Sequence, residues 1–142
     1  MIDKGYLLFL GAGIWQEYAI KKAKSMGIRT AVVDGNRISS GFKHSNLSCV
    51  IDFYSDGNGV IEWLEQENIK LRGVLSYCTD KGILLAGKIR EKYKLDGIGP
   101  KTSKNMVNKY YQRKIWKKHN LPCPKWFKQD RISIDIDYIN NN

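Results

Sequence analysis

The chain has 142 residues, 42% of them hydrophobic, and is therefore long enough for one domain with a buried core. No apolar run approaches the roughly 18 residues of a membrane span, and the first apolar run is too short for a secretory signal, so we expect a cytoplasmic location. The formal net charge of +10 favours anionic partners, while the three scattered cysteines argue against a disulfide framework or a zinc site.

Residues 6–93 alternate between strand and helix patterns. In chain order we expect strands at residues 6–10, 28–34, 48–53 and 71–77 and helices at residues 14–26, 59–68 and 80–93. The inward faces of the first two helices are expected to carry Trp15, Tyr18, Ala19, Ala23 and Met26, and Val60, Ile61 and Leu64, respectively. Such alternation forms right-handed crossovers, so it predicts an α/β fold: a Rossmann-like parallel sheet with helices on both faces.

After residue 94 the sequence changes in character. We expect one basic helix over residues 101–121, with Thr102 or Ser103 near its start, and then an extended, proline-containing segment. The apolar face of this helix is expected to carry Val107, Tyr110, Tyr111 and Ile115. The expected organisation is a domain at residues 1–100, a basic helix and linker at residues 101–128, and a short tail at residues 129–142.

The positive charge is concentrated in the second of these parts. Residues 101–128 hold nine lysines and arginines and no acidic residue, whereas residues 1–100 hold 14 basic and 11 acidic residues. Such a block attracts nucleotide phosphates, nucleic acid or an acidic partner surface. A solvated helix face explains the same composition equally well.

A glycine turn joins the first expected strand to the first expected helix. Gly11 and Gly13 let the backbone turn sharply and approach a ligand, and the helix start offers free N–H groups to an anion. Asp34 lies 23 residues after Gly11, where the acid of a dinucleotide-binding domain holds the ribose. Gln16, however, stands where the third glycine of that motif is required. A tight turn without a ligand is the alternative.

A second turn between strand and helix, at residues 76–82, should lie at the same edge of the sheet. Ligands of open α/β sheets bind outside the carboxyl ends of the strands. We therefore expect a substrate-binding crevice lined by Gly11, Ala12, Gly13, Ile14, Trp15, Asp34, Asn36, Ser76, Thr79 and Asp80. Helix capping is the alternative role of Thr79 and Asp80, and no catalytic residue is assigned because Asp80 lacks a paired acid.

Five motifs follow one another from residue 5 to about residue 127: FLGAGIWQ, VVDGN, LSYCTDKG, GIGPKTSKNMVNK and HNLPCP. In their order and spacing they resemble the N-terminal domain of the ATP-grasp ligases. This superfamily includes biotin carboxylase, the carbamoyl-phosphate synthase large subunit and phosphoribosylamine–glycine ligase. The resemblance implies a preATP-grasp domain that binds a small carboxylate or phosphate-bearing substrate. The complete enzyme would use ATP to form an acyl phosphate, which an amine or another nucleophile then attacks.

The resemblance also implies residues for the nucleotide. It assigns phosphate binding to Lys109, with Arg113 or Lys114 as a second candidate, and it implies ATP and Mg²⁺ as cofactors of the complete enzyme. The second phosphate lysine, the glycine loop and the magnesium-binding acids of the family do not follow residue 128. We therefore expect a fragment that is inactive alone and binds no cofactor tightly.

Two other functions stay open. An NAD(P)-binding domain of an oxidoreductase or regulatory protein is favoured by Asp34 and opposed by Gln16. A basic nucleic-acid binding module is supported by charge and by Tyr110, Tyr111 and Trp116, although the helical spacing of these aromatic residues suits packing better. We expect no membrane partner and no nucleic-acid partner, and we leave a homodimer open.

Overall fold

The computed structural model describes residues 5–127 and divides the chain into two compact units, Met1–Val107 and Asn108–Asn142. The two units are described separately below. Within residues 5–127 no helix is long and apolar enough to cross a bilayer. The predicted tail at residues 129–142 lies outside the described residues.

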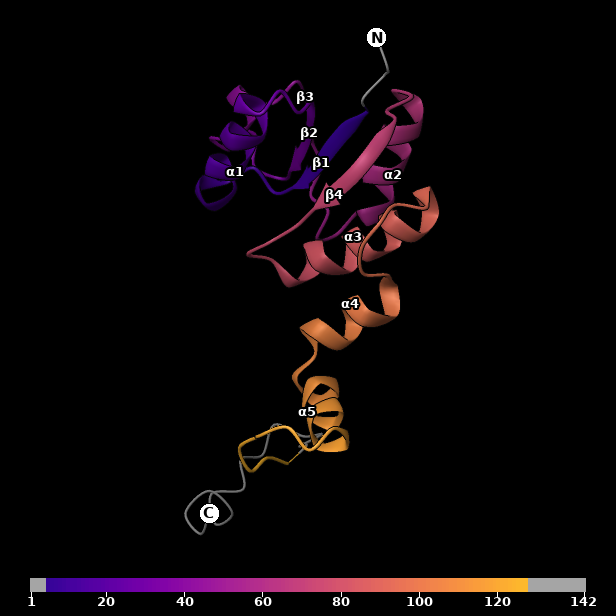
Figure 1. Ribbon diagram of the computed structural model, residues 1–142. Helices are drawn as coiled ribbons and strands as arrows, with labels where there is room; N and C mark the ends of the chain where they lie inside the picture. Colours follow the sequence, from indigo (N-terminus) through magenta and orange to yellow (C-terminus); the bar gives the residue numbers. More distant parts are fainter. Residues whose placement is uncertain (1–4, 128–142) are drawn as a thin grey trace. The chain divides into compact units, whose positions relative to one another are not determined.

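A four-stranded parallel sheet forms the centre of the first unit (Figure 1). Its strands are β1 (Tyr6–Leu10), β2 (Thr30–Asp34), β3 (Leu47–Val50) and β4 (Leu71–Leu75), and they lie in the order β3-β2-β1-β4. The central position of β1 explains its continuous apolar sequence, because a strand covered on both faces has no polar side. Leu8 pairs with Ala31 on one side and with Val74 on the other. The predicted parallel sheet is confirmed.

Three strands are shorter than the sequence predicts, because neighbouring turns use the backbone groups at their ends. The N–H of Ile28 still donates to the carbonyl of Ala23 and closes the preceding helix, so β2 begins only at Thr30. At the end of β3, the N–H of Phe53 turns back to the carbonyl of Ile51. The third expected strand therefore ends at Val50.

Helices cover both faces of the sheet, as predicted. On one face, α1 (Ile14–Ser25) packs Ile20 and Ala23 against Phe9 and Val32. On the other face, α2 (Gly57–Gln66) and α3 (Asp80–Tyr93) cover the sheet, and their buried side chains include Val60, Leu64, Leu85 and Ile89. A short 3-10 helix, η1 (Phe42–His44), lies beside α1.

The predicted buried face of α1 is wrong for its three largest residues. Trp15, Tyr18 and Met26 are 75%, 76% and 63% exposed, whereas Gln16, Ile20 and Ala23 are buried. Positions 16, 20 and 23 lie on one side of a helix, and the bulky positions 15, 18 and 26 are rotated away from it. Ala23 was predicted correctly, and Ala19 packs partly against the core.

The single basic helix predicted for residues 101–121 is also wrong. Two helices occur instead, α4 (Pro100–Val107) and α5 (Lys109–Lys118). Asn108 separates them with extended backbone, and its side-chain oxygen accepts from the N–H groups of Tyr110 at 3.0 Å and Tyr111 at 3.3 Å. Asparagine favours such a cap over a helix interior because its side chain competes for backbone hydrogen bonds. The predicted apolar face is divided between the helices, and Ile115 is 37% exposed.

Helix α4 belongs to the first unit, which ends at Val107. Ser103 is fully buried within α4 and does not cap it. A Cβ atom on Gly87 of α3 would overlap the Ser103 Oγ, so the two helices approach closely at this point. Arg90 of α3 fastens the same region, since its guanidinium donates to the carbonyls of Val74 at 2.8 Å and Ile98 at 3.3 Å.

Candidate functional site at the carboxyl edge of the sheet

Because all four strands run in parallel, the loops that follow them meet at one edge of the sheet. We call this edge the carboxyl edge and define it by residues 11–16, 34–36, 51–54 and 76–80. It contains the ten residues predicted to line the substrate crevice. Two hollows of the first unit, with volumes of about 550 and 390 Å³, lie beside the amino ends of the strands.

The glycine turn after β1 has the geometry that its sequence predicts. Gly11 has φ +109°, which favours glycine, and its N–H donates to the Val33 carbonyl at 2.8 Å. Gly13 precedes α1 without a capping side chain, so no side chain of the described residues accepts from the first N–H groups of the helix. Ile14 and Trp15 carry these groups, and their side chains are 77% and 75% exposed. The helix start is thus open to a ligand.

Asp34 holds this turn with both of its carboxylate oxygens. Oδ2 accepts from the N–H of Ala12 at 2.7 Å, and Oδ1 accepts from the N–H of Asn36 at 2.8 Å. The Ala12 carbonyl accepts in turn from the N–H of Gly41 at 2.7 Å. A Cβ on Gly41 would lie 2.7 Å from that carbonyl oxygen, so this contact requires a glycine. Asp34 therefore has a structural partner on each oxygen.

The β4–α3 turn brings three further predicted residues to the same edge. Ser76 has a buried Oγ without a hydrogen-bond partner in the described residues, and Thr79 caps α3 by accepting from the N–H of Gly82 at 3.4 Å. The predicted capping role of Thr79 is confirmed. Asp80 is exposed in the first turn of α3. Cys78 is also exposed and has φ +60°.

Sequence reasoning missed three residues of this edge. Tyr54, from the β3–α2 loop, contacts the Thr79 hydroxyl through its own hydroxyl, and its carbonyl accepts from the Lys81 ammonium at 3.2 Å. Gln16 and Tyr77 connect the first and last turns by hydrogen bonds. A glutamine within a glycine motif was the one available signal, and nothing in the local pattern pointed to its partner, Tyr77.

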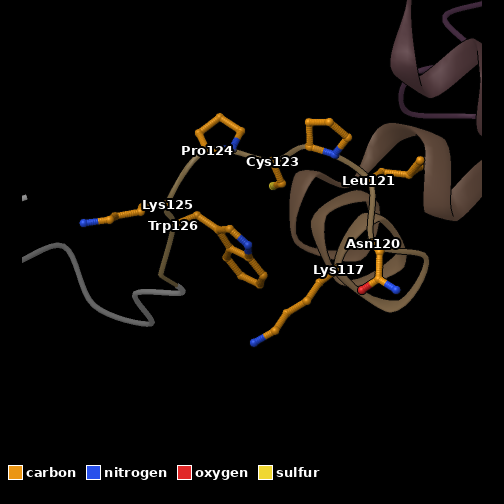
Figure 2. A pocket seen from close by; sticks show the side chains of 8 residues that line it. Lys117, Asn120, Leu121, Cys123, Pro124, Lys125 and Trp126 are labelled. Carbon is orange, nitrogen blue, oxygen red and sulfur yellow. The ribbon is translucent and has the colours of Figure 1, made fainter.

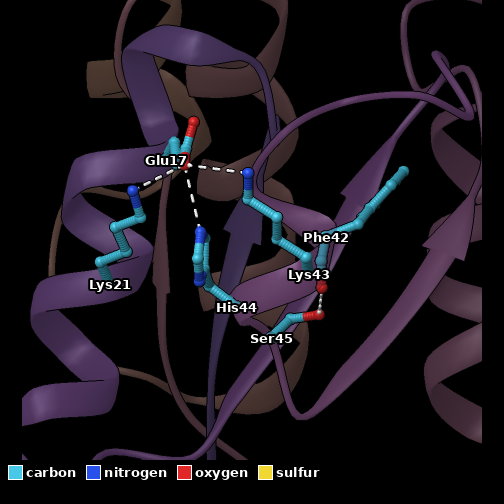
Figure 3. Close-up of polar contacts among 6 residues, drawn as sticks. All are labelled: Glu17, Lys21, Phe42, Lys43, His44 and Ser45. Carbon is cyan, nitrogen blue, oxygen red and sulfur yellow. Dashed lines mark hydrogen bonds and ion pairs between the residues drawn. The ribbon is translucent and has the colours of Figure 1, made fainter.

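In the first turn of α1, next to Gln16, Glu17 forms a cluster of ion pairs with three basic residues (Figure 3). Its Oε1 lies 2.7 Å from the Lys21 Nζ, 3.1 Å from the His44 Nε2 and 3.8 Å from the Lys43 Nζ. The hydrogen bond from Lys21 is the main reason why the pKa of Glu17 falls to about 2. The cluster ties α1 to η1 and neutralises positive charge beside the glycine turn.

The second unit contains α5 and the segment that follows it, around a hollow of about 620 Å³ (Figure 2). The ring of Trp126 packs edge-on against Tyr110 at 5.7 Å. Lys109 is exposed and its Nζ donates to the Gln112 Oε1 at 3.4 Å, a long and weak contact. The Arg113 Nη1 lies 3.9 Å from the Cys123 Sγ. Both predicted phosphate-binding residues therefore belong to the second unit, whereas the residues of the carboxyl edge belong to the first.

Solved structures show what this architecture is similar to, whereas no family model and no curated protein sequence matches the chain. Phosphoribosylglycinamide synthetase from Anaerococcus prevotii is 27% identical over 82% of this chain, with a TM-score of 0.70. L-Amino acid ligase from Bacillus licheniformis is 15% identical over 85% of the chain, with a TM-score of 0.73. N5-Carboxyaminoimidazole synthetase from Staphylococcus aureus, complexed with ADP, is 16% identical over 97% of the chain, also with a TM-score of 0.73.

These matches cover 29%, 32% and 35% of the solved chains, so this chain spans about a third of their length. All three are ATP-grasp enzymes. The chain has the fold of an ATP-grasp N-terminal domain. The resemblance that the sequence motifs indicate is thus confirmed at the level of fold.

The predicted crevice residues gather at one edge of the sheet, but they differ in accessibility. Ile14, Trp15, Asn36 and Asp80 are exposed, Gly13, Asp34, Ser76 and Thr79 are half-buried, and Gly11 and Ala12 are buried. Among residues 5–127, no group of three acidic, histidine or cysteine side chains could hold a metal ion. The described residues therefore offer no such set of ligands for Mg²⁺.

Proposed function

We propose that this chain is the N-terminal, substrate-binding domain of an ATP-dependent ligase that joins a carboxylate to an amine or another nucleophile. The observation that carries the proposal is the match at 27% identity and a TM-score of 0.70 to a phosphoribosylglycinamide synthetase. The glycine turn, the parallel sheet and the basic α5 occur in the order that the ATP-grasp resemblance predicts.

In this proposal the carboxyl edge binds the acceptor side of the substrate. The first N–H groups of α1 carry no side-chain cap and suit a single carboxylate or phosphate group. The buried Oγ of Ser76, which lacks a partner among the described residues, is the neighbouring polar group with a hydrogen bond still to make. These features support binding of a small anion rather than catalysis by the domain itself.

Lys109 and Arg113 would contact the polyphosphate of ATP. Residues 108–127 contain six lysines and arginines and no acidic residue, so an anion meets no competing carboxylate there. The weak contact of Lys109 with Gln112 can be exchanged for a phosphate oxygen. Mg²⁺ would neutralise developing phosphate charge when bound, and its ligands belong to the remainder of such an enzyme. The fragment alone is expected to bind ATP weakly and to have no ligase activity.

An NAD(P)-binding domain is the weaker candidate. Its main support is Asp34, whose two carboxylate oxygens each accept from a backbone N–H, so holding the glycine turn explains this residue without a ribose. The absence of a nucleic-acid partner and the cytoplasmic location stay predictions. A homodimer stays open.

The proposal is tested with the longest polypeptide that carries this domain in its reading frame. Purified protein is incubated with ATP, Mg²⁺, a panel of small carboxylates and hydroxylamine, which intercepts acyl phosphates as hydroxamates. The proposal predicts ADP and hydroxamate with at least one carboxylate, and neither with residues 1–142 alone. Tight NAD binding without carboxylate-dependent ADP formation would support the dinucleotide-binding alternative.

A further inference from the structure

Two hydrogen bonds run in opposite directions between α1 and the β4–α3 turn. The Gln16 Nε2 donates to the Tyr77 carbonyl at 3.1 Å, and the Tyr77 hydroxyl donates to the Trp15 carbonyl at 2.8 Å. Each segment thus offers a side chain to the backbone of the other. We call this pair the Gln16–Tyr77 clasp. It joins residues 61 and 62 positions apart in the sequence.

The Gln16 side chain also covers the glycine turn. It is only 8% exposed, and a Cβ placed on Gly11 would lie 3.2 Å from the Gln16 Cδ and 3.3 Å from its Nε2. The amide group therefore lies against Gly11, in the space that the third glycine of a dinucleotide-binding motif leaves for close packing of helix and strand. Burial of the Tyr77 phenol, which raises its pKa, indicates that the other half of the clasp is partly removed from water.

Resting on the proposed function, we propose that the Gln16–Tyr77 clasp determines the specificity of the carboxyl edge. Gln16 fills the space that the third glycine of that motif leaves open beside Gly11, and the two hydrogen bonds fix the separation of the turns. The edge then accepts one small anionic group at the start of α1 and rejects dinucleotides. Gln16 and Tyr77 are positioning residues, because they act through the backbone of the two turns.

Calorimetric titration of residues 1–142 with NAD tests the part played by the Gln16 side chain. The wild-type chain is expected to give no binding at millimolar NAD. Gln16→Gly removes the side chain over Gly11 and restores the third glycine of the motif, so NAD should bind at least about tenfold more tightly. Gln16→Met is the matched control, because it keeps the length of the side chain and removes the donor. NAD should remain excluded from it.

Hydrogen exchange tests the part played by the two bonds. In Gln16→Met and Tyr77→Phe, the amides of residues 13–15 and 77–79 should exchange about fivefold faster, since each variant loses one hydrogen bond. The amides of β1 should exchange at the wild-type rate. Hydrogen exchange also tests the Gln16–Tyr77 clasp if Gln16→Gly does not fold.

The outcomes separate this inference from the proposed function. Unchanged exchange in both bond-deleting variants, or a folded Gln16→Gly chain that still rejects NAD, overturns the clasp as a specificity device and leaves the ligase proposal standing. Tight NAD binding by the wild-type chain contradicts the proposed function itself. Exclusion by the wild type with admission by Gln16→Gly supports the clasp.

Discussion

The two units of this chain differ in how their polar and charged side chains are paired. In the first unit, Asp34, Gln16 and Glu17 each find partners within the chain, so the loops of the carboxyl edge are held before any ligand arrives. In the second unit, six basic residues occur between residues 108 and 127 without an acidic residue beside them in the sequence. Under the proposed function, the first arrangement positions a substrate and the second binds the phosphates of ATP. The comparison predicts different effects of mutation in the two regions.

The largest effect is expected in the second unit and appears in catalysis. In the complete polypeptide, Lys109→Ala should raise KM for ATP or lower kcat, because loss of one preorganised charge at the phosphates costs about 2–4 kcal/mol of transition-state stabilisation. Steady-state kinetics with ATP measures this loss. Lys117→Ala, on the same helix, is the control and should change kcat/KM by much less. Equal behaviour of the two variants would show that Lys109 is only part of a solvated basic face.

Asp34→Ala should have the largest effect on the stability of the first unit. It removes the acceptor of two backbone N–H groups, and hydrogen bonds to charged groups contribute about 1.5–3 kcal/mol each before relaxation. We expect a loss of about 2–3 kcal/mol in the free energy of unfolding, measured by urea denaturation. Asp34→Asn keeps one acceptor and should lose less. An unchanged urea midpoint for Asp34→Ala would instead favour a carboxylate reserved for a ligand.

Gly41→Ala tests the close contact between the Gly41 loop and the glycine turn by adding one methyl group. The added Cβ would lie 2.7 Å from both the Ala12 carbonyl oxygen and the Ile20 Cδ1, so the loop must move away from the glycine turn. Overpacking of this kind costs about 1–3 kcal/mol, which thermal denaturation can detect. Gly99→Ala is the matched control because no atom lies within 4 Å of its added Cβ. Similar melting temperatures for both variants would contradict the close contact.

The smallest expected effect is a pH-dependent loss of stability when Glu17 is replaced. Its pKa is about 2 in the folded chain against 4.5 for an unperturbed glutamate, so its ion pairs stabilise the fold fully above pH 4.5. This contribution is lost as the pH falls toward 2. Glu17→Gln should therefore lower the melting temperature at pH 7, and the difference from wild type should shrink in acid. Glu62→Gln, an exposed site on α2, is the control. A difference that does not vary with pH would rule out the ion pairs as its cause.

The sequence predicted those parts of the fold that depend on local pattern. Apolar runs located all four strands, and Gly11 and Gly13 located the turn that begins the candidate site. The inward face of α1 was not predictable in this way, because Gln16 is buried by a partner 61 residues away. The break at Asn108 was missed because periodicity ignores a cap within a helical pattern. Long-range contacts of single polar side chains, rather than composition, decide these details.

The central claim is that this domain serves an enzyme that activates a carboxylate with ATP. The most direct measurement uses the complete polypeptide and a carboxylate substrate labelled with the heavy oxygen isotope in its carboxyl group. Attack of a carboxylate oxygen on the γ-phosphorus forms an acyl phosphate, and the nucleophile then displaces phosphate from the carbonyl carbon. The account predicts that the released inorganic phosphate carries one labelled oxygen, as mass spectrometry would show. Product formation with unlabelled phosphate, or no carboxylate-dependent ADP at all, would contradict it.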